Sequence, residues 1–486
     1  MSAVDPAVGP VAADAAPTPG RERLSLSKVL GPAHIWGLGV GIVLVGEYMG
    51  WNFSVEKGGM FGALIAAWVV GVLYTCVAMI DSEVTSTVAA AGGQYTQAKH
   101  MIGPLMAFNV GLFLVLEYTM LEASNANVMS YLSTTIAAQL GHTGSVNQYA
   151  FIVLAVMVLA FLNYRGVFAT LSLNFVITAV AFIAILALFF GLEGWSPSAS
   201  LHHEGLAGSM GNGLPYGWIG VIAAMQFGMW YYLGIEGTCQ AAEECRSAAR
   251  SIPLGTMTGM ITLLIAAVLT WYVCAGTLPW QYLGVSITPL FDTALVSGSP
   301  ALGVLLAVGT VLATLASANG CINDASRAWF SMGRDHYIPP WFGAIHPRYR
   351  TPFRSILFLV PVGIAFASLP VLLNKPELLA TVITFSILSA LLSYGFMVPN
   401  MFRFRRLWPI GTLHRGYVHP FHPLPAITLA LIALLVMFAT FLGYGTTLVT
   451  LIVFYLLASA WFVLFRYRYV RRGSQFTMPW PRPKGY

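Results

Sequence analysis

Long apolar segments alternate with short polar segments along almost the whole chain. A helix that crosses the hydrocarbon core of a bilayer needs roughly 20 apolar residues. Twelve segments satisfy this requirement, and we predict a membrane-crossing helix for each of them. The predicted spans are 32–56, 60–90, 104–138, 147–163, 168–192, 216–243, 253–279, 299–332, 354–373, 377–401, 422–442 and 446–466. The pattern therefore predicts an all-α polytopic membrane protein.

The charged residues support this count. Only 9% of the 486 residues are charged, against roughly 25% in soluble domains. With the N-terminus placed inside and twelve alternating spans, 22 of the 24 lysine and arginine residues fall in inside segments, and only Lys57 and Lys375 fall outside. Basic loops mark the cytoplasmic side of a membrane protein. We therefore expect both termini in the cytoplasm and read the net charge of +6 as a topology signal rather than as a sign of nucleic-acid binding.

Two predicted spans are interrupted by glycines that lie beside a carboxylate. The first span contains Glu47 between Gly46 and Gly50, and the sixth contains Glu236 next to Gly237. If spans 1–5 and 6–10 form two halves, these are the first helices of the two halves. Glycine-interrupted helices at matching places indicate the binding site of a transporter. Ordinary glycine packing between helices is the alternative.

The same pattern divides the chain into parts. We expect a disordered cytoplasmic tail over 1–28, a membrane transport domain over 29–470 (repeat one 32–192, repeat two 216–401, two accessory helices 422–466) and a cytoplasmic tail over 471–486. The N-terminal twenty residues lack the basic and apolar regions of a signal peptide. The five cysteines have neither metal-binding nor CxxC spacing and are interpreted as free, mostly buried thiols.

Polar motifs between the spans add a family signal. They are Ala91-Gly-Gly-Gln-Tyr95, Ala241-Ala-Glu-Glu-Cys-Arg246 through Pro253, and Ser326-Arg-Ala-Trp-Phe-Ser-Met-Gly-Arg-Asp335 through Pro339. With these motifs the chain resembles, from about residue 30 to 470, the amino acid–polyamine–organocation (APC) transporters. The resemblance implies a LeuT-type fold with a 5+5 inverted repeat and broken helices 1 and 6. It also implies a monomer or homodimer in the lipid bilayer.

The two interruptions resemble narrower groups within that superfamily. The stretch Gly46-Glu-Tyr-Met-Gly-Trp-Asn52 is similar to the first-helix break of bacterial ethanolamine permeases, which implies a bacterial inner-membrane location. The stretch from Trp230 to Glu236 is similar to the sixth-helix break of arginine/agmatine exchangers. There a tryptophan acts as a gate and a glutamate follows six residues later, which implies a gating role for Trp230.

Glu47 bears on the substrate. In amino-acid members of the superfamily, the first break presents free backbone N–H groups to the substrate carboxylate. A glutamate in that break can accept those hydrogen bonds itself, and its charge repels a carboxylate. We therefore expect a substrate that carries a cation and no carboxylate.

Further acids and aromatic side chains accompany Glu47. Carboxylates inside a membrane span are functional candidates by default, and aromatic faces bind ammonium groups. Glu117 and Glu122 lie five residues apart, roughly 140° around a helix, and we favour Glu117 because it lies nearer the apolar centre. The expected substrate-binding residues are Gly46, Glu47, Tyr48, Gly50, Glu117, Tyr118, Trp230, Tyr231, Gly234 and Glu236, with Trp230 as the gate.

Other polar residues are assigned structural roles. Gate or loop ion pairs with Lys99, Arg246, Arg327 and Arg334 are expected for Asp81, Glu83, Glu243, Glu244, Asp324 and Asp335. We expect no metal site and no cofactor. Some members of the superfamily that the chain resembles hold a sodium ion with hydroxyls of the eighth helix, and others replace that ion with a lysine of the fifth helix. The fifth span here has no lysine, and the eighth offers Thr314, Ser317, Asn319 and Asn323. Coupling to H⁺ or Na⁺, amine exchange and uniport therefore stay open as alternatives.

The resulting hypothesis is a permease for a small organic amine, with ethanolamine as the favoured substrate. A polyamine or cationic amino-acid/amine exchanger is the alternative within the superfamily, and a membrane receptor without net transport is the alternative from another class. No nucleophile–base pair or nucleotide-binding loop indicates an enzyme.

Overall fold

The computed structural model describes residues 25–139, 147–193, 214–375, 378–412 and 415–470. These ranges are helical, and their β structure is confined to one bridge between Leu30 and Cys245. The α-helices are α1 (Pro32–Val43), α2 (Val45–Tyr48), α3 (Phe53–Thr87), α4 (Gly93–Met101), α5 (Pro104–Gln139), α6 (Gln148–Arg165), α7 (Val167–Glu193), α9 (Gly217–Gly228), α10 (Ala248–Thr277), α11 (Trp280–Leu283), α12 (Pro289–Val296), α13 (Pro300–Arg334), α14 (Phe353–Leu372), α15 (Leu378–Leu407) and α16 (Leu424–Trp461). Short turns of other helix types are η2 (Met229–Tyr231), η3 (Ile235–Glu244), η4 (Pro340–Gly343), η5 (Phe462–Arg466) and η6 (Tyr467–Tyr469).

Ten helices in the described ranges are long and apolar enough to cross a membrane. Two features explain the difference from the twelve predicted spans. The predicted first span is divided, because α1 has only 12 residues and α2 has 4. The predicted eleventh and twelfth spans form one continuous helix, α16, which bends at Tyr444 (φ −136°, ψ 40°). The all-helical membrane fold is confirmed, and the exact number of crossings stays a prediction.

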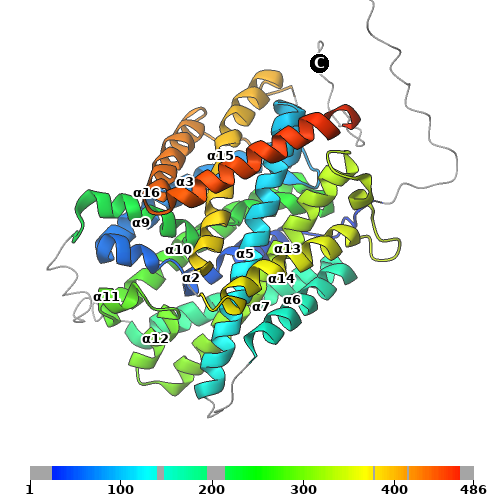
Figure 1. The fold of residues 1–486 in the computed structure, drawn as a ribbon. Helices are drawn as coiled ribbons and strands as arrows, with labels where there is room; N and C mark the ends of the chain where they lie inside the picture. Colours follow the sequence, from blue (N-terminus) through cyan, green and yellow to red (C-terminus); the bar gives the residue numbers. More distant parts are fainter. Residues whose placement is uncertain (1–24, 140–146, 194–213, 376–377, 413–414, 471–486) are drawn as a thin grey trace, which may run out of the picture.

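The interrupted helices lie at the centre of the bundle. The most apolar window of Gly217–Glu244 is 78% buried inside the protein, whereas the corresponding windows of α6 and α7 are 28% buried. In Figure 1, α5 runs through the middle of the bundle beside α13 and α14, and it contacts α13, α14 and α15. α6 and α7 therefore present much of their surface to lipid, while α1, α9, η3 and α5 surround the core.

The described ends of the chain lie on one face of the bundle, which we call the terminal face. Leu30 pairs with Cys245, and the Arg466 guanidinium donates hydrogen bonds to the carbonyls of His336 (2.9 Å) and Ile338 (3.0 Å). The other end of the bundle, where α11 and α12 lie, is called the opposite face. Residues 1–24 of the predicted tail over 1–28 lie outside the described residues. The predicted tail over 471–486 lies outside them entirely. Leu26, within the first of these tails, is buried against Ala91 and Phe330.

Candidate functional site

The two helix breaks contact each other, and Gly46 is the reason they can. A Cβ atom at Gly46 would lie 1.8 Å from the Trp230 carbonyl oxygen, so a larger residue cannot occupy this position without moving the backbone. Gly50 lies against the Trp230 ring and has a φ of 93°, which favours glycine. The helical turn α2 ends at Tyr48, and the backbone of the next residue, Met49, is extended. The predicted residues Gly46, Gly50 and Trp230 therefore come together as the spacing implied.

The second break is shaped by Gly234. Its φ of 109° ends the turn that contains Trp230 and starts η3, which carries Glu236. A Cβ atom on Gly234 would lie 2.3 Å from the Ile42 side chain. Glycine is therefore required here both for the backbone conformation and for the close approach of α1.

Glu236 and Glu117 form a carboxyl pair at the centre of the bundle. Both are buried, and their carboxyl groups are within hydrogen-bonding reach of each other once one of them carries a proton. The Tyr394 hydroxyl donates a hydrogen bond to Glu236 Oε1 (2.7 Å), and Tyr394 is in turn 3.2 Å from the Tyr74 hydroxyl. α5, η3, α15 and α3 thus each contribute one side chain to this centre.

Two further acids interact electrostatically with this pair. Asp324 of α13 and Asp81 of α3 both interact with Glu236, and Gly237 gives Asp324 the space to approach. Neither Glu117 nor Glu236 makes an ion pair within the described part of the chain. Carboxylates gathered in a low-dielectric interior repel one another and carry a high desolvation cost, which a bound cation would offset.

Buried polar atoms without a hydrogen-bond partner are concentrated around the same place. Such atoms cost free energy unless a ligand or water satisfies them. Among the described residues they include both carboxylate oxygens of Glu47 and of Glu117, one oxygen each of Glu236 and Asp324, the hydroxyls of Tyr118 and Tyr231, and the indole nitrogen of Trp230. Six of the predicted site residues are buried and keep at least one polar side-chain atom without a hydrogen-bond partner among the described residues: Glu47, Glu117, Tyr118, Trp230, Tyr231 and Glu236.

Glu47 lies in a different environment from the carboxyl pair. It belongs to the helical turn α2, before the chain becomes extended at Met49, and it is fully buried. Its carboxylate accepts no backbone N–H group among the described residues, in contrast to the sequence-based expectation. Its neighbours are Thr270 of α10 and the rings of Tyr231 and Tyr232.

Two other candidates point away from the centre. The Tyr48 hydroxyl donates a 2.6 Å hydrogen bond to the Ala181 carbonyl of α7 and packs against Gly309 of α13. Glu122 lies beside Gly363 of α14. Since Glu117 faces Glu236, the helical offset between Glu117 and Glu122 separates their environments, as their spacing of five residues requires.

A cavity of about 320 Å³ leads from the opposite face toward the breaks. Its lining includes Gly50, Phe227 and Trp230, together with Tyr131 of α5 and Tyr444 at the bend of α16. The carboxyl pair is not among the lining residues of this cavity, whereas Trp230 is. Trp230, the predicted gate, therefore lines this cavity, and its role as a gate stays a prediction.

The terminal face is closed by ion pairs. Arg327 of α13 binds Glu244 of η3 through Nη2 (2.9 Å to Oε1) and through a short contact from Nε, and its Nη1 donates to the Asn323 carbonyl (2.9 Å). Arg334 binds Glu243 at 3.0 Å. These contacts confirm the expected pairing of Glu243 and Glu244.

The pairing of Asp335 also agrees with the sequence. Lys99 of α4 lies 2.8 Å from Asp335, and the Tyr95 hydroxyl donates to the same carboxylate at 2.9 Å. Asp335 and Asp324 differ in this respect. Asp324 accepts a hydrogen bond from the Asn323 amide (2.8 Å) and forms no ion pair within the described ranges.

Asp81 and Glu83 depart from the expected partners. Asp81 accepts hydrogen bonds from the amides of Gln94 (2.8 Å) and Gln97 (3.1 Å) instead of pairing with a base. The prediction of an ion pair was therefore wrong for Asp81, as it was for Asp324. The amides belong to α4, whose packing beside α3 was not evident from the spacing.

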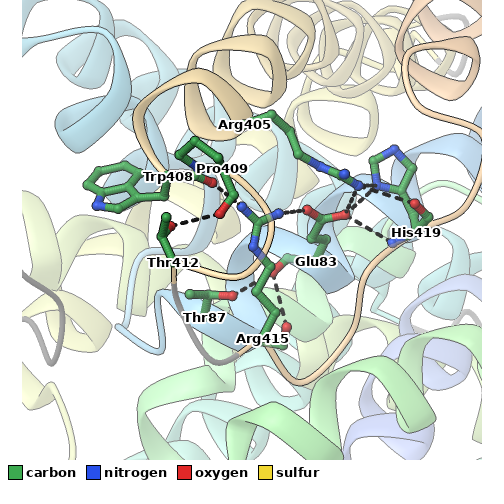
Figure 2. A network of polar contacts seen from close by, with 9 residues as sticks. Glu83, Thr87, Arg405, Trp408, Pro409, Thr412, Arg415 and His419 are labelled. Atoms are coloured by element: carbon green, nitrogen blue, oxygen red, sulfur yellow. Dashed lines mark hydrogen bonds and ion pairs between the residues drawn. The ribbon is translucent and has the colours of Figure 1, made fainter. Parts of the chain in front are cut away.

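Glu83 binds residues from the far end of the chain (Figure 2). Its carboxylate accepts hydrogen bonds from Arg405 (2.6 Å), from the His419 backbone (2.9 Å) and in a short contact from Arg415, and His419 Nδ1 lies 2.6 Å away. We call Glu83, Arg405, Arg415 and His419 the Glu83 cluster. It joins the terminal-face end of α3 to the segment between α15 and α16. The basic run from Arg403 to Arg406 was the only sequence signal for it.

Three of the four α13 residues that were considered for ion coupling have side chains bound to protein partners, whereas Asn323 donates to Asp324 and keeps a buried side-chain oxygen without a partner among the described residues. Ser317 donates to the Ile42 carbonyl of α1 (2.5 Å) and accepts from Asn125 (2.7 Å), and Thr314 donates to the Thr310 carbonyl (2.7 Å). Asn319 bonds to Asn163 and Asn174, as the sequence did not indicate. Across the described residues, no group of three or more His, Cys, Asp or Glu is arranged to hold a metal ion.

Comparison with known proteins places this geometry in a family. Residues 25–464 match the amino acid permease family. An uncharacterized transporter of Rhizobium meliloti (strain 1021) is 64% identical over 472 residues, which cover 97% of this chain and 99% of that protein. A methylthioribose transporter of Bacillus subtilis (strain 168) is 26% identical and covers 70% of this chain and 75% of its own. A branched-chain amino acid permease of the same organism is 25% identical, with coverages of 71% and 75%.

Proposed function

The chain belongs to the amino acid permease family of the APC superfamily, and from this premise we propose that it carries a small organic amine cation, with ethanolamine as the favoured substrate. It is a secondary transporter and not an enzyme. Members of the family transport substrates as different as branched-chain amino acids and methylthioribose. Family membership therefore leaves the substrate to be argued from the site.

The carboxyl pair of Glu117 and Glu236 carries the proposal. Two buried carboxyl groups lie side by side with Asp324 and Asp81 close by and with no ion pair to either glutamate among the described residues. An ammonium group that entered this centre would supply the missing positive charge and the hydrogen-bond donors. A substrate carboxylate would meet only like charge.

The aromatic groups around the pair support an organic cation over an inorganic one. Tyr118 lies near Glu117 and Glu236, and Tyr394 is hydrogen-bonded to Glu236 and lies beside Tyr74. Aromatic faces attract ammonium groups by about 0.5–2 kcal/mol each. In this proposal, a small amine with one hydroxyl group uses Glu117 and Glu236 for its ammonium end and the unpartnered Tyr118 hydroxyl for its own hydroxyl end.

Glu47 favours one alternative substrate class. Apart from the carboxyl pair, Glu47 is another buried carboxylate without a hydrogen-bond partner in the described part of the chain. Its neighbours differ from those of the pair. A diamine or polyamine has two ammonium groups and would satisfy both places at once. A polyamine or cationic amino-acid/amine exchanger therefore remains the second proposal.

The proposed cycle is alternating access across the bacterial inner membrane, with both termini in the cytoplasm and twelve crossings. The terminal face is closed by the ion pairs of Glu243, Glu244 and Asp335, and the cavity that ends at Trp230 opens toward the opposite face. We therefore assign this conformation to the outward-facing half of the cycle, with Trp230 closed over the site. Movement of the two five-helix repeats relative to each other would then open the terminal face.

Uptake by proteoliposomes tests the proposal. The purified chain should accumulate or exchange radiolabelled ethanolamine, and unlabelled ethanolamine should compete while arginine and leucine should not. Competition by putrescine but not by ethanolamine would select the polyamine alternative. Transport of leucine with no effect of ethanolamine would contradict both proposals.

A further inference from the structure

A second cavity of about 420 Å³ lies on the opposite face, between the end of α5 and the segment from α11 to α12. Asp292 of α12 is its acidic residue, and Tyr131 and Tyr282 supply aromatic rings. Tyr131 and Ile287 line both this cavity and the cavity that ends at Trp230. The two cavities are therefore neighbours along the route from the opposite face to the gate.

The Asp292 carboxylate is held by neutral donors only. It accepts hydrogen bonds from the hydroxyls of Ser286 (2.5 Å), Tyr282 (3.2 Å) and Thr288 (3.2 Å). It makes no ion pair with any residue that the structure describes. Hydroxyl donors fix the position of a carboxylate but leave its charge uncompensated, so the charge remains available to a cation in the cavity.

The segment that carries these donors is anchored to the first helix break. The buried Asn52 side chain donates hydrogen bonds to the carbonyls of Leu283 (2.7 Å) and Ser286 (2.8 Å), and its oxygen accepts from the Gly50 backbone (3.0 Å). Gly284 packs directly against Glu56. The Asp292 cavity is thus connected by hydrogen bonds to Gly50, the residue that contacts the Trp230 ring.

We propose that the Asp292 cavity is a second, outer binding site for a small organic ammonium ion, occupied before the ion passes Trp230. The carboxylate supplies the charge, the rings of Tyr131 and Tyr282 supply aromatic faces, and Ser286 and Thr288 supply oxygen atoms for a substrate hydroxyl. The choice of ammonium as the ligand rests on the proposed function. The existence of the site rests on the cavity and its donors.

Equilibrium binding of radiolabelled ethanolamine to the full chain in nanodiscs tests the inference. The wild-type chain should bind two equivalents, D292N should keep only the central one, and E236Q should keep only the outer one. E56Q is the matched control, because it removes one acidic charge from the same face but Glu56 already pairs with Lys57 (3.3 Å). E56Q should therefore keep both equivalents.

Variants of Tyr282 distinguish a loss of ligand binding in D292N from a disturbance of the cavity's structure. Y282F keeps the ring and should keep the outer equivalent, whereas Y282A should weaken its affinity by roughly 3- to 10-fold through loss of one aromatic face.

A single equivalent in the wild-type chain, or equal losses in D292N and E56Q, would overturn the outer site. Loss of an equivalent in D292N but not in E236Q would instead refute the proposed central site and leave the outer one standing. If no chain binds ethanolamine, tetramethylammonium is used in its place, and failure of that probe overturns the outer site as well.

Discussion

The pair of Arg327 and Glu244 should control the opening of the terminal face. It connects α13 to η3, the half-helix that follows the second break, and these elements have to separate when the face opens. Both side chains are almost fully buried, at 2% and 0% exposure. The substitution R327Q removes the charge, the two hydrogen bonds to Glu244 and the bond to the Asn323 carbonyl.

The magnitude follows from the burial of the pair. Removing one partner of a buried ion pair costs about 3–5 kcal/mol, because the remaining charge is left uncompensated. If the closed state alone contains the pair, R327Q shifts the equilibrium toward the open state by this amount. Each 1.4 kcal/mol is tenfold in an equilibrium constant, so the ratio of open to closed molecules should rise by roughly 10²-fold to several thousandfold.

Cys245 provides the assay. It follows Glu244 directly, is 3% exposed, and its pKa is raised to about 12 by burial and by the nearby Glu244 charge. In the closed state it should therefore react very slowly with a maleimide at neutral pH, since the thiolate is the reactive form. In a chain whose other four cysteines are replaced by alanine, R327Q should label faster in proportion to the open population.

The control is K57Q, which breaks an ion pair on the opposite face between side chains that are 42% and 48% exposed. Exposed pairs contribute about 0–1 kcal/mol, so K57Q should label at the wild-type rate. The double variant R327Q/E244Q should recover part of the wild-type protection, because no buried charge is left unpaired. Unchanged labelling of R327Q, in a chain that remains folded, would refute the assignment of this pair to the closed state.

Three further predictions concern the breaks, the central pair and the Glu83 cluster. G46A should abolish uptake and lower the melting temperature, because the new Cβ atom collides with the Trp230 backbone at a cost of about 1–3 kcal/mol or more; wild-type uptake would contradict the close packing. Y394F should weaken amine binding by roughly tenfold, measured by isothermal titration, because Glu236 loses its 2.7 Å donor. E83Q should lower the melting temperature more than K57Q does, because it removes a buried charge that holds two arginines.

The sequence was most informative where the backbone requires a glycine. Glycines at 46, 50 and 234 predicted broken helices at the centre of the protein, and the structure has breaks there. The glycines differ in purpose, however. Gly50 and Gly234 adopt positive φ, whereas Gly46 lies inside a helical turn and is small because of Trp230. Composition and spacing alone cannot distinguish these two uses of glycine.

The direction of individual side chains could not be read in the same way. Glu47 was expected to face the free N–H groups of the break, but the helix continues through Tyr48 and turns Glu47 toward Thr270. One additional helical residue rotates a side chain by about 100°, so the exact end of α2 decides the environment of Glu47. An error of one or two residues in a predicted helix end is therefore enough to misplace it.

Contacts between segments that are distant in the sequence were also not predicted. Glu83 and His419 are separated by 336 positions and meet because α3 and α15 end on the same face. Lys99 was an equally reasonable partner for Glu83 in the sequence, but it binds Asp335. The Asp292 cavity likewise depends on how α11 and α12 fold over the end of α5. Such arrangements depend on tertiary packing, which apolar periodicity does not specify.

The central claim is that Glu117 and Glu236 bind the ammonium group of the substrate. The most direct test is the affinity of E236Q and E117Q for ethanolamine, measured beside E122Q, which removes the same charge from the same helix but faces Gly363. We expect E236Q and E117Q each to lose at least roughly 100-fold in affinity, since each removes a charge-assisted hydrogen bond in a buried site, while E122Q binds like the wild-type chain. Equal affinities of all three variants and the wild-type chain would contradict the account.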